Sequence, residues 1–109
     1  MPKYYITTPI YYVNGKPHIG SAYTTIIADV VARYHRLRGD ELYFLTGTDE
    51  NSQKNVEAAK KAGQDVQAYV DDMSRIWLDT FTASEISFDD FIRTTEDRHK
   101  KAVEKFWHA

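Results

Sequence analysis

The longest periodic pattern in the chain predicts an amphipathic helix over residues 19–38. Apolar residues recur there at spacings of three and four positions, which places them along one face of a helix. They are Ala22, Tyr23, Ile26, Ile27, Val30, Val31, Tyr34 and Leu37. Arginines in the last turns suit the negative end of the helix dipole, and Gly39 is suited to a left-handed cap. We therefore expect this helix to end near Arg38.

Two short apolar runs flank this helix and predict strands. Residues 4–8 are aromatic or β-branched and stop at a proline, as a strand that ends in a loop does. Residues 42–45 form a continuous apolar run, which is typical of a buried parallel strand. Residues 9–18 are rich in turn formers and predict a loop. A right-handed β-α-β crossover would bring the carboxyl ends of the strands, Thr8 and Thr46, to one sheet edge.

The second half of the chain predicts further helices and one more strand. We expect helices over residues 51–62 and from Asp65 to residue 81, and an irregular strand within residues 86–94. A capping-box pattern at residues 94–97 begins a last helix. Its expected buried face is Ala102, Val103, Phe106 and Trp107. Because no stop signal closes this helix, we expect the sequence to be a piece of a longer one.

The composition indicates a single globular domain over residues 1–109. Hydrophobic residues make up 42% of the chain and charged residues 28%, which excludes wholesale disorder. The net charge of -2 excludes a global positive field for nucleic acid, so any RNA contact must be local. The absence of cysteine excludes disulfides and cysteine-based zinc sites and favours a cytoplasmic location. No segment has the length of a membrane span.

The start of the long helix is a candidate anion site. Residues 17–21 read Pro-His-Ile-Gly-Ser, where free backbone N–H groups and the helix dipole point toward the sheet edge. His18 and Ser21 can donate hydrogen bonds to phosphate oxygens, and Gly20 permits close approach of a ligand. In the alternative interpretation, His18 only caps the helix and Gly20 only relieves crowding.

An acidic turn lies beside this loop in the predicted topology. Residues 47–50 read Gly-Thr-Asp-Glu at the end of the second strand. The Asp49 carboxylate could bind a ligand ammonium group, hold a metal or cap the next helix. His35, His99 and His108 match no spacing of metal ligands, so we expect no metal site in this chain. Tyr11 and Tyr12 could form a pocket wall or pack in the core.

Several separated segments resemble the amino-terminal part of methionyl-tRNA synthetases, which are class I aminoacyl-tRNA synthetases. The segments are residues 7–20, 22–25, 32–39, 44–50 and 89–96, so the resemblance covers nearly the whole chain. It implies an α/β fold in which these residues form the first half of a Rossmann-type, doubly wound parallel sheet, truncated before its second half.

The resemblance also implies roles for individual residues. It assigns ATP binding to His18, Gly20 and Ser21, with His18 and Ser21 as the catalytic residues. It assigns methionine binding to Pro9, Ile10, Tyr12 and Asp49. The chain departs from the family pattern at Ser21, where a second histidine is usual, and at residues 51–52, where His-Gly is common.

The implied activity is the ATP-dependent conversion of methionine to methionyl-adenylate, followed by transfer to tRNA. Mg²⁺ would accompany the nucleotide, and the segment would bind no zinc. The carboxyl-terminal half of the catalytic domain, with its lysine-rich loop, is the missing partner, so we expect the isolated segment to be nearly inactive. Two alternatives stay open: a truncated or designed nucleotide-binding fragment without catalysis, and a related nucleotidyltransferase.

Overall fold

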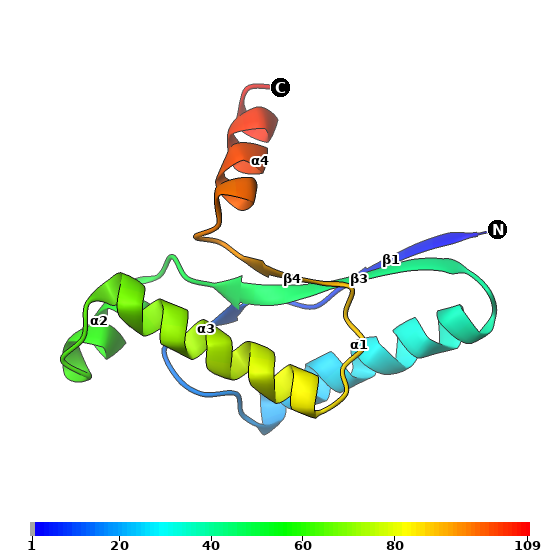
Figure 1. Ribbon diagram of the computed structural model, residues 1–109. Coiled ribbons are helices and arrows are strands. Elements are labelled where there is room, and N and C mark those ends of the chain that lie inside the picture. The colour runs from blue at the N-terminus through cyan, green and yellow to red at the C-terminus, as the bar shows by residue number, and fades with distance from the viewer. Residues whose placement is uncertain (1) are drawn as a thin grey trace.

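The computed structural model describes residues 2–109, which form a parallel sheet with two long helices against one of its faces (Figure 1). The elements in chain order are β1 (Lys3–Thr7), β2 (Tyr11–Tyr12), α1 (Ile19–Leu37), β3 (Glu41–Asp49), α2 (Gln53–Lys61), α3 (Val66–Ala83), β4 (Asp90–Arg93) and α4 (Asp97–Trp107). The predicted α/β fold with a parallel sheet is confirmed.

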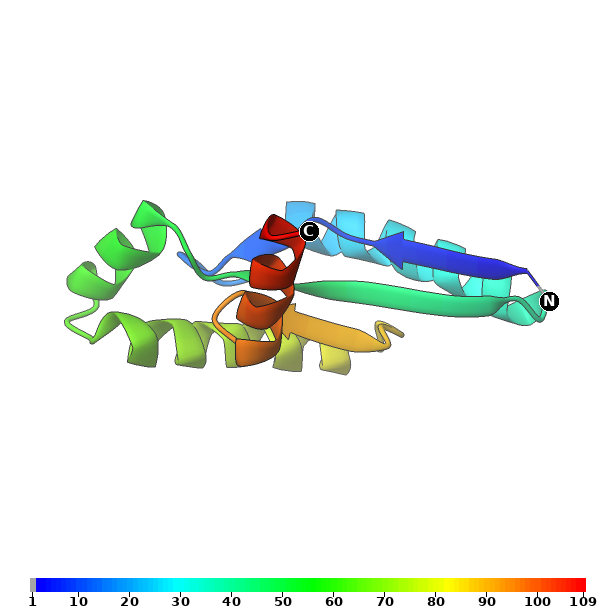
Figure 2. The ribbon, with the colours of Figure 1, turned by 90° about the horizontal axis from the view of Figure 1, so that it is seen from above.

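The strand β3 is the centre of the sheet. Its residue Leu45 pairs with Thr7 of β1 and with Asp90 of β4, so these two strands lie on opposite sides of β3. Further along, Thr48 pairs with Tyr11 of β2, which therefore lies on the same side as β1. All of these pairings are parallel. The sheet seen from above shows β1, β3 and β4 side by side (Figure 2).

The helices α1 and α3 lie against the same face of the sheet (Figures 1 and 2). The core is formed between this face and the helices by Val13, Ala28, Ala32, Phe44, Ala59, Tyr69, Val70, Met73, Trp77, Phe81 and Ile86. One-sided coverage follows from the right-handed crossovers between neighbouring parallel strands. The opposite face of the sheet carries α4 near one end and is otherwise open within the described residues (Figure 2).

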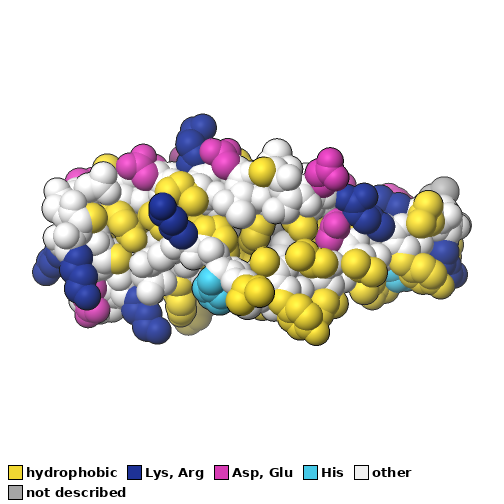
Figure 3. Space-filling view, turned by 90° about the horizontal axis from the view of Figure 1, so that it is seen from below, with side chains coloured by type: hydrophobic (Ala, Val, Ile, Leu, Met, Phe, Trp, Pro, Cys, Tyr) yellow, Lys and Arg dark blue, Asp and Glu magenta, His cyan; other side chains and the backbone are white. Residues whose placement is uncertain are grey.

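The helix α1 has the predicted extent but packs through an unexpected face. It is capped by Arg38, and Gly39 adopts a φ of 85°, as predicted for a left-handed stop. Its buried side chains are small or polar: Ser21, Thr25, Ala28, Asp29 and Ala32. Its exposed large apolar side chains are Ile19, Tyr23, Ile26, Ile27, Val30, Tyr34 and Leu37. These hydrophobic side chains gather on the face of the molecule that carries α1 (Figure 3).

Two other sequence predictions need correction. The segment 9–18 is not entirely a loop, because β2 extends the line of β1 and adds two residues to the sheet. The expected buried face of α4 is wrong, since none of its residues is buried and its start has no side-chain cap. This helix projects away from the sheet, so no other element within residues 2–109 covers it (Figure 1). The caps of the two preceding helices, Ser52 and Asp65, form hydrogen bonds to backbone N–H groups.

Candidate functional site

The carboxyl ends of β1 and β3 meet at one edge of the sheet, as predicted. The Thr8 hydroxyl lies 2.6 Å from the Thr46 hydroxyl, and both side chains are buried. Two polar segments leave the sheet at this edge. One leads from β1 through β2 to the start of α1, and the other is the turn that follows β3. In open parallel sheets, ligands bind beyond the carboxyl ends of the strands.

His18 is the N-cap of α1, and its ring is held by the backbone that it caps. Its Nδ1 accepts a hydrogen bond from the Gly20 N–H at 3.0 Å. A neutral imidazole with an acceptor at Nδ1 carries its proton on Nε2, so Nε2–H can donate to a ligand. His18 therefore does cap the helix, as the alternative interpretation expected. The cap uses only Nδ1, so Nε2 is available to a ligand.

Gly20 and Ser21 support this histidine. A Cβ atom at Gly20 would lie 2.9 Å from Cε1 of His18, so glycine leaves room for the ring in this position, and a larger residue would displace it. The Ser21 hydroxyl accepts a hydrogen bond from the His18 N–H at 3.0 Å and donates to the His18 carbonyl at 2.8 Å. Ser21 is buried, and its hydroxyl completes a capping box. These two hydrogen bonds of the Ser21 hydroxyl hold the His18 backbone in place.

An open cavity of about 390 Å³ lies between the loop after β2 and α3. It is lined by Ile10, Tyr11, Tyr12, Asn14, Gly15, Lys16, His18 and Trp77. Three of the predicted site residues, Ile10, Tyr12 and His18, thus share one cavity. Sequence reasoning did not identify Lys16 and Trp77 as lining residues. The sequence does contain a sign of the Lys16 charge at this site, because Lys16 lies only two residues before His18.

The acidic turn lies beside a strand residue that lines this cavity. Tyr12 is the register partner of Asp49, and partners on parallel strands project from the same face of a sheet. One Asp49 carboxylate oxygen, Oδ1, accepts a hydrogen bond from the Asn51 N–H at 3.1 Å. The structure therefore brings Asp49 next to a wall of the cavity. Of the predicted residues, Pro9, Gly20, Ser21 and Asp49 itself do not line this cavity, and Pro9 is exposed.

An ion pair between the buried Glu50 and the half-buried Arg93 adjoins the acidic turn. The Glu50 side chain is fully buried, and Arg93 at the end of β4 donates two hydrogen bonds of 2.8 Å to its carboxylate. The hydrogen bonds to Glu50, and then the one to Asp71, hold the pKa of Arg93 above its usual value despite burial. Sequence analysis did not identify Glu50 or Arg93. Their signal was a charged residue at the carboxyl end of each of two neighbouring strands.

Fold and site geometry together define an α/β domain of the class I synthetase type. The family model described as tRNA synthetases class I (M) matches residues 4–109, and the chain belongs to this family.

Relatives and solved structures agree with this assignment. The chain is 59% identical over 104 residues to a methionine–tRNA ligase of Rickettsia bellii (strain RML369-C), covering 95% of the chain and 20% of that relative. It is 53% identical over 104 residues to the same enzyme of Thermotoga maritima, covering 95% of the chain and 16% of that relative. The chain therefore spans about a fifth or less of the length of these relatives.

A solved structure shares the whole fold. It is the Mycobacterium tuberculosis methionyl-tRNA synthetase in complex with methionyl-adenylate, with a TM-score of 0.96 and 42% identity. The match covers 99% of this chain and 21% of that one.

Among residues 2–109, no three His, Cys, Asp or Glu side chains are grouped as a metal site. No helix in this part of the chain is long and apolar enough to cross a membrane.

Proposed function

We propose that this chain supplies part of the methionine and ATP sites of a methionine–tRNA ligase. The complete protein would activate methionine with ATP to methionyl-adenylate and then transfer the methionyl group to tRNA. The observation that carries the proposal is that the His18 helix start and the Asp49 turn leave the sheet at one edge, where His18 and Tyr12, the register partner of Asp49, line one cavity. The solved relative in complex with methionyl-adenylate supports it.

The ATP phosphates would bind at the start of α1. The Nε2–H of His18 and the Lys16 ammonium group supply donors and positive charge there, and the helix dipole favours an anion. In this proposal Gly20 makes room for the histidine ring, and Ser21 keeps that ring in place. Catalysis would arise from positioning and from stabilising charge on the α-phosphate during attack by the methionine carboxylate.

Methionine would bind between the loop after β1 and the end of β3. Ile10, Tyr12 and Trp77 offer an apolar wall for a thioether side chain, and Pro9 precedes this wall. The Asp49 carboxylate would accept a charge-assisted hydrogen bond from the methionine ammonium group. Since the ammonium group does not react, Asp49 would orient the substrate.

The remaining partners follow from the same proposal. Mg²⁺ would arrive with the ATP phosphates, whose oxygens are the hard ligands that it prefers. The tRNA acceptor end would approach the adenylate at this sheet edge in the complete protein. The proposed location is the cytoplasm, in keeping with a chain free of cysteine.

The test is methionine-dependent exchange of pyrophosphate into ATP, measured on the longest natural reading frame that contains this chain. We expect Asp49→Asn to abolish saturation by methionine while ATP binding, followed by calorimetry, is retained. The exposed Asp79 on α3 gives a matched control, because Asp79→Asn removes the same charge from a side chain that does not line the cavity. Equal loss of both ligands in Asp49→Asn would contradict the proposed role.

A second measurement addresses the 109-residue chain by itself. We expect it to show almost no exchange activity, because it spans about a fifth of its relatives and does not contain the lysine-rich loop that the family resemblance implies for holding the phosphates. Methionine-dependent exchange by the purified chain would contradict this expectation.

A further inference from the structure

The buried carboxylate of Glu50 is saturated with hydrogen bonds. Arg93 Nε donates to Oε2 and Arg93 Nη2 to Oε1, each at 2.8 Å. The Thr48 hydroxyl donates to Oε2 and the Thr95 hydroxyl to Oε1, each at 2.9 Å. Four donors on one carboxylate fix both its position and its rotation. The Glu50 side chain, which directly follows Asp49 in the sequence, is therefore held in one orientation.

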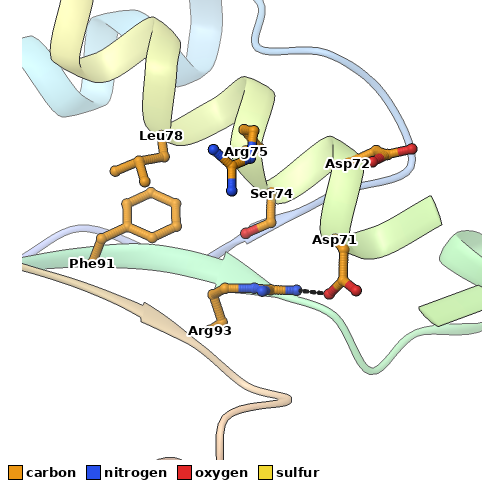
Figure 4. Close-up of a pocket in the computed structure, with 7 residues that line it drawn as sticks. All are labelled: Asp71, Asp72, Ser74, Arg75, Leu78, Phe91 and Arg93. Atoms are coloured by element: carbon orange, nitrogen blue, oxygen red, sulfur yellow. Dashed lines mark hydrogen bonds and ion pairs between the residues drawn. The ribbon is translucent and has the colours of Figure 1, made fainter. Parts of the chain in front are cut away.

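The same arrangement extends to a second strand and to α3. Nη2 of Arg93 also donates to the Asp71 carboxylate, so the guanidinium group bridges β4 and α3 (Figure 4). The Glu50 N–H donates to the Thr94 hydroxyl at 2.8 Å, which ties the backbone of the turn to the end of β4. In Figure 4, Arg93 lies along one wall of an open cavity that Ser74 and Asp71 also line.

Burial alternates along the end of β3. Thr48 and Glu50 are buried, with the Thr48 hydroxyl 3.2 Å from that of Ser74 on α3, whereas Asp49 between them is half-buried and is the register partner of Tyr12. Successive side chains of an extended segment point to opposite faces. A restraint on Glu50 therefore sets the direction in which Asp49 leaves the sheet.

Asp49 is held both through its backbone and through one oxygen of its carboxylate. Its carbonyl accepts a hydrogen bond from the Asn55 amide at 3.1 Å, and its Oδ1 accepts one from the Asn51 N–H at 3.1 Å. Its second carboxylate oxygen, Oδ2, has no hydrogen bond to any residue from 2 to 109. An oriented carboxylate with one open oxygen is suited to a ligand ammonium group.

A buried ion pair is a poor way to gain stability. Desolvation of the two charges offsets most of their attraction, so apolar residues of similar size would stabilise a fold equally well. What charged, saturated groups offer is a unique geometry, and a preorganised binding group loses less entropy when its ligand binds.

We propose that Glu50 and Arg93 are positioning residues that aim the open oxygen of Asp49 at the ammonium group of an α-amino acid. The inference rests on the proposed function for the identity of that ligand. Glu50 and Arg93 touch neither substrate in this arrangement and act through the turn that carries Asp49.

Two variants test the pair in the longest reading frame that contains the chain. Glu50→Gln removes the charge at nearly constant shape, and Arg93→Lys keeps the charge but loses the two-pronged geometry. We expect either change to raise the KM for methionine about tenfold or more and the KM for ATP less than about threefold, because a small misplacement of a binding group is costly. Equal changes in both KM values, or no change in a folded variant, would overturn the proposal.

Arg98 supplies the matched control. It pairs with Asp90 and Glu96 beside the same strand and does not contact Glu50. We expect Arg98→Lys to leave the KM for methionine at the wild-type value. A rise as large as that of Arg93→Lys would assign the effect to general loosening of β4 and would count against a specific positioning pair.

Amide hydrogen exchange gives a readout that needs no activity. The Glu50 N–H donates to the Thr94 hydroxyl and the Asn51 N–H donates to Asp49 Oδ1, so both variants should speed hydrogen exchange at these two amides about tenfold while amides of α3 keep their protection. Unchanged exchange at these two amides, or global unfolding of both variants, would overturn the positioning role. The two proposals can fail separately. If the wild type lacks methionine-dependent pyrophosphate exchange but the variants still speed amide hydrogen exchange in the turn, the proposed function fails and the positioning of Asp49 stands.

Discussion

The phenol ring of Tyr11 stacks on the indole of Trp77, with ring centroids 5.0 Å apart and planes inclined by 14°. The Tyr11 hydroxyl lies 2.8 Å from the Thr25 hydroxyl on α1, and the Trp77 indole N–H donates to the Gly15 carbonyl at 3.0 Å. One aromatic pair thus joins β2 and the following loop to both long helices. Since this loop leads into His18, the packing of Trp77 sets the shape of the cavity wall.

The first prediction concerns the stability that this pair contributes. Trp77 is 3% exposed, so Trp77→Ala should lower the free energy of unfolding by about 3–5 kcal/mol, as for other buried aromatic truncations. Tyr11→Phe removes only the hydroxyl and should cost about 1 kcal/mol. Urea unfolding followed by circular dichroism measures both. The exposed Tyr5 is the control, and Tyr5→Phe as costly as Tyr11→Phe would contradict the role of the Thr25 contact.

The second prediction concerns the close approach of β3 and β4. A Cβ atom added at Gly47 would lie 1.9 Å from the backbone oxygen of Ile92, which is far inside the contact distance. Backbone atoms must shift to relieve such a clash, so Gly47→Ala should destabilise the chain by about 3 kcal/mol or more, at the upper end of overpacking costs.

Gly15 provides the comparison for this second prediction. No atom lies within 4 Å of a Cβ placed at Gly15, so Gly15→Ala should change the free energy of unfolding by less than about 0.5 kcal/mol. Equal unfolding midpoints for the two alanine variants would show that the strands can separate without cost.

The parts of the fold with strong local signals were predictable from sequence. The helix from Ile19 is an example, because a cap, a three-and-four apolar period and Gly39 all agree. Which face of that helix would be buried was not predictable. The helix approaches the sheet through small and polar side chains such as Thr25 and Ala28, and hydrophobicity alone does not reveal that preference for close approach. Two-residue strands such as β2 have no periodicity to detect.

The site was predictable only as far as single residues carry chemistry. The location of His18 and Asp49 at one edge follows from the β-α-β topology. The pairing of Glu50 with Arg93, 43 positions apart, depends on which strand lies next to β3, and no local pattern specifies that. The hydroxyl of Ser21 was expected to face a ligand, and the capping box that occupies it depends on the side-chain geometry of His18.

The third prediction separates the two roles of His18. Asparagine is among the best N-cap residues, so His18→Asn should preserve the start of α1 while it removes the Nε2–H donor. We expect the melting temperature to stay within a few degrees and the dissociation constant for ATP to rise about tenfold, as for loss of one charge-assisted or strong hydrogen bond. Titration calorimetry on the longest reading frame measures this effect. Unchanged ATP affinity would place the phosphates elsewhere.

The last prediction is a pH dependence of stability that originates in Asp29. This carboxylate of α1 is buried, and burial alone would raise its pKa. Hydrogen bonds from the hydroxyl and the backbone N–H of Ser87, together with the bond and charge of Arg33, outweigh burial and hold the pKa of Asp29 below its ordinary value of 3.8. The folded state thus binds this proton more weakly than the unfolded chain does.

A pKa that is lower in the folded state contributes stability above the unfolded pKa and loses it as pH falls through the folded pKa. The free energy of unfolding should therefore decline below about pH 4, where an unfolded aspartate takes up its proton. Asp29→Asn should be less stable at pH 7 by about 1–3 kcal/mol, because a buried hydrogen-bonded charge is lost. It should also show a shallower decline between pH 4 and pH 2. Urea midpoints across this range measure the slope, with Asp79→Asn expected to follow the wild-type curve, and equal slopes for Asp29→Asn and the wild type would contradict the assignment.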